Sequence, residues 1–179
     1  AKYDAELAND PALLALLRKE AEGGMTSSDP AVRGLSLQLS ATLAQYGTDS
    51  TASLMELYGS LSAKDRDALP MVLAELSKRG DDPRVRMVLE QALADEATAP
   101  PNRLIAADGL FASGGSERVY DAIASSKGAD MTTLLTGIAL ARGGNEAASR
   151  LERIAQATED PTKKQAITDQ LKAWSAASN

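Results

Sequence analysis

The stretch Asp81-Asp82-Pro83-Arg84-Val85-Arg86-Met87-Val88-Leu89-Glu90-Gln91-Ala92-Leu93 joins a helix start to an apolar stripe. Asp82 can accept hydrogen bonds from the free N–H groups of a first helical turn, and Pro83 stands where a missing N–H costs nothing. Apolar side chains then recur at the spacing of one helical face: Val85, Val88, Leu89, Ala92 and Leu93. The same Asp-Pro start occurs at residues 10–11, 29–30 and 160–161. We therefore expect a repeated helix start.

The apolar residues of the chain are those that favour helices. The 179 residues include 33 Ala and 24 Leu but only one Phe and one Trp. Ala and Leu have high helix propensity, whereas β-branched and aromatic residues favour strands. No segment alternates Val, Ile, Thr or Tyr in the manner of a strand. The sequence therefore predicts an all-α fold.

Composition also excludes several kinds of chemistry. The chain has no Cys and no His, so it lacks thiolate nucleophiles, disulfides, serine–histidine triads and the commonest metal ligands. Phosphate-binding glycine loops and their strands are missing as well. The carboxylate pairs Asp65/Asp67 and Asp81/Asp82 read as helix-start charges rather than a catalytic or calcium site. We expect a protein that is not an enzyme and that holds no cofactor and no metal.

The charge and hydropathy of the chain bound its partners. The formal net charge is −6, which argues against nucleic acid as a partner. No apolar run is long enough to span a membrane, so we expect a soluble protein of the cytoplasm or periplasm. The first residue is Ala1, as in a processed form or a part of a longer protein. We expect a monomer.

Turn signals divide the chain into helices joined by short links. The expected helices are Asp10–Glu22, Asp29–Tyr46, Asp49–Tyr58, Asp67–Arg79, Asp82–Asp95, Asn102–Ser113, Ser116–Ser125, Asp130–Arg142, Glu146–Ala157 and Asp160–Ala176. Glycine joints fall at Gly47, Gly80, Gly114 and Gly143, at intervals of 33, 34 and 29 residues. A period near 30 residues with two helices per period is typical of an α-solenoid.

Several of these segments resemble HEAT repeats of the short bacterial type, as in the phycobilisome-lyase class. The resemblance is carried by Asp29–Arg33 and Asp82–Arg86, which share Asp-Pro-x-Val-Arg, by Arg103–Ala107, and by Gly137–Gly144. It implies an α-solenoid of about four antiparallel helix pairs over residues 29–179, preceded by an N-terminal helix and linker at 1–28. Tetratricopeptide repeats share the period and rank second.

Four side chains are the candidates for binding a partner: Arg33, Arg86, Tyr58 and Tyr120. The arginines follow the repeated helix starts, and their alternative role, implied by the HEAT resemblance, is to link neighbouring repeats. Tyrosine is enriched at interfaces. The tripeptide Arg79-Gly80-Asp81 spells an integrin-binding motif but also joins a helix end to a helix start, and the structural interpretation is favoured.

The expected function is that of a scaffold or adaptor which binds a protein or peptide on a concave solenoid face. Two alternatives remain open. One is a structural subunit of a larger assembly or of the cell envelope. The other, implied by the HEAT resemblance, is a lyase-type or ligand-binding protein, since that class includes bilin lyases.

Overall fold

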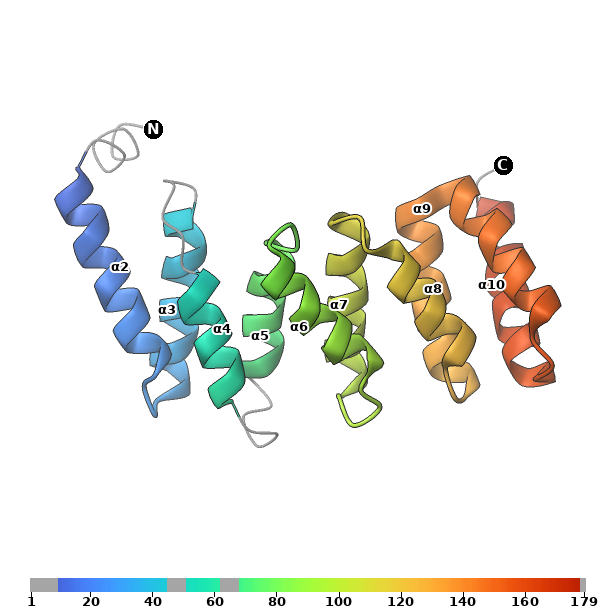
Figure 1. Cartoon of the computed structure of the whole chain (residues 1–179), viewed down its shortest axis with the longest axis horizontal. Helices are drawn as coiled ribbons and strands as arrows, with labels where there is room; N and C mark the ends of the chain where they lie inside the picture. Colours follow the sequence, from blue (N-terminus) through green and yellow to red (C-terminus); the bar gives the residue numbers. More distant parts are fainter. Residues whose placement is uncertain (1–9, 45–50, 62–67, 178–179) are drawn as a thin grey trace. The chain divides into compact units, whose positions relative to one another are not determined.

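The computed structural model describes residues 10–44, 51–61 and 68–177, and these residues form an all-α protein (Figure 1). Within them lie nine helices and no strand. The helices are α2 (Pro11–Met25), α3 (Pro30–Ala44), α4 (Thr51–Ser60), α5 (Ala68–Ser77), α6 (Pro83–Ala94), α7 (Pro100–Ala112), α8 (Ser116–Ser125), α9 (Ala129–Ala157) and α10 (Pro161–Ala177). The predicted fold class, all-α, is confirmed.

The chain divides into two compact units, residues 1–76 and 77–179. Each unit has its own core of leucine and other aliphatic side chains. In unit 1 the fully buried side chains include Met25, Leu37, Leu43, Leu54 and Leu73, and in unit 2 they include Leu89, Leu93, Leu110, Ile123, Leu135 and Leu151. Burial of such side chains is the main favourable contribution to folding.

All four repeated Asp-Pro sequences begin helices, as predicted. The carboxylate of Asp82 accepts the Arg84 N–H at 2.9 Å, and that of Asp10 accepts two N–H groups of α2. Asp29 and Asp160 accept N–H groups of α3 and α10 in the same way. Each carboxylate thus pairs with N–H groups that have no partner inside the helix.

The first helix of unit 1 ends later than predicted. Gly23 and Gly24 do not end the first helix, because α2 continues to Met25. Gly24 is instead a point of close approach between α2 and α3. A Cβ atom at this position would lie 1.9 Å from the Oγ of Ser36. Met25, one residue further on, is 1% exposed, so the extra turn adds a buried side chain to the core.

Unit 2 is built from consecutive helices that pack on each other and on the helix after next. α6 packs against α7 and α8, α7 against α8 and α9, and α9 against α10. α9 consists of two helical arms that meet at Gly144, where φ is 55° and ψ is −133°. A positive φ of this kind favours glycine. The predicted turn at Gly143-Gly144 between two helices is therefore confirmed.

The proline pair Pro100-Pro101 was expected to precede its helix, and that prediction is wrong. α7 begins at Pro100, so both prolines lie in its first turn. They fit there because the first N–H groups of a helix have no intrahelical acceptor. Within the described ranges, no helix is both long and apolar enough to cross a membrane. The predicted features at Tyr46, Gly47, Asp65 and Asp67 lie outside the described residues.

Candidate ligand-binding groove

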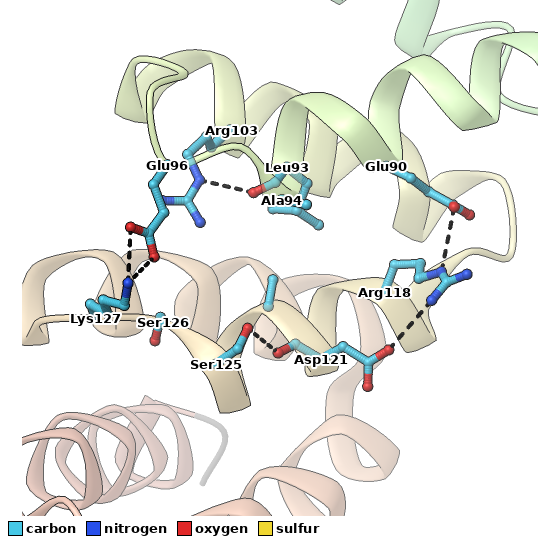
Figure 2. Close-up of a pocket in the computed structure, with 11 residues that line it drawn as sticks. Glu90, Leu93, Ala94, Glu96, Arg103, Arg118, Asp121, Ser125, Ser126 and Lys127 are labelled. Carbon is cyan, nitrogen blue, oxygen red and sulfur yellow. Dashed lines mark hydrogen bonds and ion pairs between the residues drawn. The ribbon is translucent and has the colours of Figure 1, made fainter.

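A groove of about 440 Å³ lies in unit 2 between α6 and α8 (Figure 2). The last turn of α6, the link to α7, the first turns of α7 and the whole length of α8 contribute to it. It is lined by Glu90, Leu93, Ala94, Glu96, Arg103, Arg118, Asp121, Ala122, Ser125, Ser126 and Lys127. Six of these side chains are charged, three of each sign. We call this site the α6–α8 groove.

One end of the groove is acidic. Arg118, in the first turn of α8, lies with its Nε 3.4 Å from Glu90 Oε2 and its Nη1 3.9 Å from Asp121 Oδ2. Arg118 and Asp121 are well exposed, with 60% and 70% of their side chains accessible. Two carboxylates and one guanidinium leave one net negative charge at this end, where Asp121 is exposed and Glu90 is half-buried.

The other end of the groove is basic. The exposed Lys127 Nζ lies 3.0 Å from Glu96 Oε1, and Arg103 Nε donates to the Leu93 carbonyl at 2.9 Å. Leu93 lies in the last turn of α6, where free carbonyls attract positive charge. Figure 2 shows the Glu96 carboxylate between Arg103 and Lys127. Two cations and one carboxylate leave one net positive charge at this end.

Hydrogen bonds hold the C-terminal end of α8 in place beside the groove. Ser126 Oγ donates to the Ile123 carbonyl and lies 2.6 Å from Thr132 Oγ1 of α9. The buried Lys163 of α10 donates from Nζ to the Ala124 carbonyl at 2.7 Å. These contacts with α9 and α10 hold the C-terminal end of α8, which forms one wall of the groove, in a fixed position.

A second set of charged contacts joins α9 to α7 and α8 outside the groove. Arg142 makes two 2.6 Å hydrogen bonds to Asp108, and these raise the pKa of the guanidinium. Arg150 pairs with Glu117 and lies 4.3 Å from the ring centroid of Tyr120. The bond to Arg150 lowers the pKa of Glu117. These arginines link α9 to α7 and to α8, and none of the residues that they pair with lines the groove.

The four predicted binding residues do not gather at one place. Arg33 and Tyr58 belong to unit 1, Arg86 and Tyr120 to unit 2. Arg86 donates to the carbonyls of Gly80 and Ser113, and Arg33 donates to the Ser27 carbonyl. Both arginines thus donate to a carbonyl six residues earlier in the chain.

The two tyrosines differ in exposure. Tyr120 is 6% exposed, and burial raises the pKa of its hydroxyl. Tyr58 is half-buried. None of the four residues lines the α6–α8 groove, and their role in partner binding stays a prediction.

Sequence reasoning missed the groove residues. Glu90, Glu96 and Lys127 carry no motif, and Arg103 was noted only as part of a repeat-like segment. Glu96 and Lys127 are 31 residues apart, so their contact depends on the packing of α8 beside α6. The one local signal is the i,i+3 spacing of Arg118 and Asp121, which places them on the same face of a helix.

Two shallower depressions are mainly apolar. One, of about 390 Å³, lies between α9 and α10 beside Leu171 and Trp174. The other, of about 350 Å³, lies between α2 and α3 beside Val32 and Leu35. Among the residues that the structure describes, no group of three acidic side chains is placed to hold a metal ion. The α6–α8 groove is therefore the candidate with the most defined chemistry.

Comparison of the chain with protein-family models, with curated proteins and with solved structures finds no match.

Proposed function

We propose that this protein is a non-enzymatic binding module that holds a segment of a partner protein in the α6–α8 groove. One observation carries the proposal, namely a groove with opposite net charge at its two ends. Its volume lies in the range of ligand-sized sites, which is about 300–1,000 Å³. Charge complementarity of this kind gives a partner its orientation and its specificity.

The contacts of the groove residues favour binding over catalysis. Each carboxylate of the groove lies beside a cation, and each is exposed or half-buried. General acid–base chemistry uses groups whose pKa values have been moved toward neutrality, usually by burial. Exposed ion pairs contribute little to stability, so their members can exchange an internal partner for an external one at small cost.

The stacking of helices in unit 2 supports the same proposal. In the HEAT-like arrangement that the sequence resembles, helices of one layer present a continuous surface to an extended ligand. The contact of α6 with α8, two helices apart in the chain, is the contact that such an arrangement requires. We propose that the chain is a HEAT-like α-solenoid and that α6 and α8 contribute to its binding face.

A pair of matched serine variants tests this function. Ser125 lines the groove and Ser149 lies on the second arm of α9. Both are exposed, and the hydroxyl of each bonds the carbonyl four residues earlier. Ser125→Arg places a long side chain in the groove, whereas Ser149→Arg makes the same chemical change elsewhere.

The measurement is quantitative capture from a source lysate with three baits, the wild type and the two variants. We expect proteins that the wild type and Ser149→Arg retain equally and that Ser125→Arg loses. Circular dichroism melting of the three baits checks that folding is unchanged. Equal capture by all three folded baits would contradict a binding role for the groove.

A further inference from the structure

We infer that the segment bound in the groove is an extended peptide with one acidic and one basic side chain about three residues apart, and that Glu96 occupies the place of its acidic group when no partner is bound. This inference rests on the proposed function and specifies the partner of the same site. It follows from the net charges at the two ends and from the contacts of Glu96.

The spacing follows from the length of α8 along the groove. Arg118 marks the acidic end in the first turn of α8, and Ser125 ends the helix beside Lys127. Seven steps of helix at 1.5 Å per residue span about 10 Å. An extended chain covers this distance in about three residues, at roughly 3.3–3.6 Å each. A ligand that meets both ends therefore needs its two charges about three residues apart.

The basic end is suited to a carboxylate that comes from outside. Arg103 donates one N–H to the Leu93 carbonyl, and the remaining donors of its guanidinium bond no residue in the part of the chain that the structure describes. A guanidinium has five N–H donors in a planar arrangement that matches a carboxylate. Arg103 is half-buried, whereas Lys127 is 81% exposed and can move to meet a ligand.

Glu96 already shows how a carboxylate fits at the basic end. Both of its oxygens lie near Lys127 Nζ, at 3.0 and 3.2 Å. Glu96 stands in the link between α6 and α7, and its side chain is 60% exposed. Little therefore holds it in place beyond the exposed ion pair. A partner carboxylate competes with Glu96 for Lys127, and displaced Glu96 returns to solvent.

The acidic end takes the basic group of the ligand. Glu90 and Asp121 lie on either side of Arg118, which cannot neutralise both. A lysine or arginine of the partner provides the missing positive charge. At the basic end, the acidic group of the ligand takes the place of the Glu96 carboxylate beside Lys127.

The test uses the full chain labelled with ¹⁵N and short peptides blocked at both termini by acetyl and amide groups. The probe contains Lys-Ala-Ala-Glu, and the comparison peptides contain Lys-Ala-Ala-Lys and Glu-Ala-Ala-Glu. We expect the probe to shift the amide signals of Ala122, Ser126 and Lys127 and to bind more tightly than either comparison peptide. Raising the salt concentration should weaken the binding.

Glu96→Gln is the decisive variant, because loss of the competing carboxylate should tighten probe binding. An exposed ion pair corresponds to about a two- to fivefold change in affinity. Lys127→Ala should weaken binding by a similar factor. Glu159→Gln removes an exposed carboxylate between α9 and α10, outside the groove, and should leave binding unchanged.

The possible results separate the inference from the proposed function. Equal binding of all three peptides, or no tightening in Glu96→Gln, overturns the inference, while a loss of captured proteins in Ser125→Arg still supports a binding groove. A further peptide replaces the glutamate of the probe by a free C-terminus. If it binds more tightly than the probe, the carboxylate bound in the groove belongs to a chain end, and the inference of an internal segment is overturned. If no peptide binds and Ser125→Arg captures normally, both proposals fall.

Discussion

At the residue scale, the side-chain contacts of this protein are of two kinds, those between near neighbours in the chain and those between helices that meet only after folding. Asp82 and the other three Asp-Pro helix starts need only N–H groups two or three residues away, and all four form. The pairing of Glu90 with Arg118 depends on two helices that meet only after folding. Local sequence contains no signal for such a contact, which is why the groove was not predicted.

The carboxylate of Asp82 gives a prediction about pH. Hydrogen bonds from the Arg84 side chain and backbone lower its pKa to about 2. A carboxylate whose pKa is lower in the folded state than in the unfolded state stabilises the fold at pH values above its unfolded pKa, which is near 3.9. This stabilisation is lost as the pH falls toward 2. We expect the melting temperature of Asp82→Asn to be lower than that of the wild type at pH 6. The difference between the two melting temperatures should be smaller at pH 3.

The control for this prediction is Arg84→Ala, which removes the side-chain hydrogen bonds to Asp82. When Asp82→Asn is made in the Arg84→Ala protein, the resulting change in melting temperature should depend less on pH. A melting difference that stays constant from pH 6 to pH 3 would show that the Arg84 contact does not act through ionisation of Asp82.

Two buried threonines of α9 give a second prediction. Thr132 Oγ1 donates to the Gly128 carbonyl and contacts Ser126 Oγ, whereas Thr136 Oγ1 is buried and no described group accepts or donates to it. Both residues are 0% exposed. Valine has nearly the same shape, so it removes only the hydroxyl.

We expect Thr132→Val to lower the free energy of unfolding by about 1–3 kcal/mol, because it removes the buried hydroxyl that bonds the Gly128 carbonyl and Ser126 Oγ. Thr136→Val should leave stability unchanged or raise it. Urea unfolding followed by circular dichroism measures both. Equal losses in the two variants would mean that Thr136 has a hydrogen bond after all.

At the element scale, the existence of the helices was easier to predict than their ends. The first helix was predicted to end at Glu22, before its glycines, but the approach of Ser36 explains why α2 has glycine at position 24. The predicted start of the next helix, Asn102, left out Pro100, although a first turn accepts proline. In both places the residue type fits two roles, and the packing of the neighbouring helix decides between them.

Gly109 of α7 gives a prediction about such packing. A Cβ atom at this position would lie 2.6 Å from the Cβ and 3.0 Å from the Cα of Ser77. Alanine favours a helix by up to about 1 kcal/mol over glycine. Overpacking against backbone costs about 1–3 kcal/mol, however. We expect Gly109→Ala to destabilise the protein in urea unfolding.

Gly137 of α9 is the matched control, because the nearest atom to its Cβ position is Gln170 Oε1 at 3.7 Å. Gly137→Ala should therefore be neutral or stabilising. If Gly109→Ala proves as stable as Gly137→Ala, the close approach of Ser77 to Gly109 is contradicted.

At the whole-molecule scale, the repeated Asp-Pro sequences predict an all-α fold more reliably than they predict the number of helices in each repeat. The two Asp-Pro-x-Val-Arg starts belong to α3 and α6, and two described helices, α4 and α5, lie between them. A strict repeat of helix pairs would separate them by an odd number of helices. A degenerate motif can mark a helix start without marking the phase of a repeat, and this limits what the sequence alone can predict.

The division into two units gives a prediction about folding. Unit 2 contains 103 residues, from Ser77 to Asn179, and has its own buried core. A unit of this size with its own core is expected to fold by itself. A fragment spanning residues 77–179 should show a helical circular dichroism spectrum and a cooperative thermal transition. A fragment without a cooperative transition would show that its core depends on unit 1.

The central claim is that the α6–α8 groove binds a partner protein, and photo-crosslinking tests it most directly. The full chain would carry p-benzoylphenylalanine in place of Ser125 or, as the control, in place of Ser149, and would be irradiated in a source lysate. We predict a discrete covalent adduct from position 125 and none from position 149, with the crosslinked partner peptide containing an acidic and a basic residue about three positions apart. The same adducts from both positions, or adducts from position 149 alone, would contradict the claim.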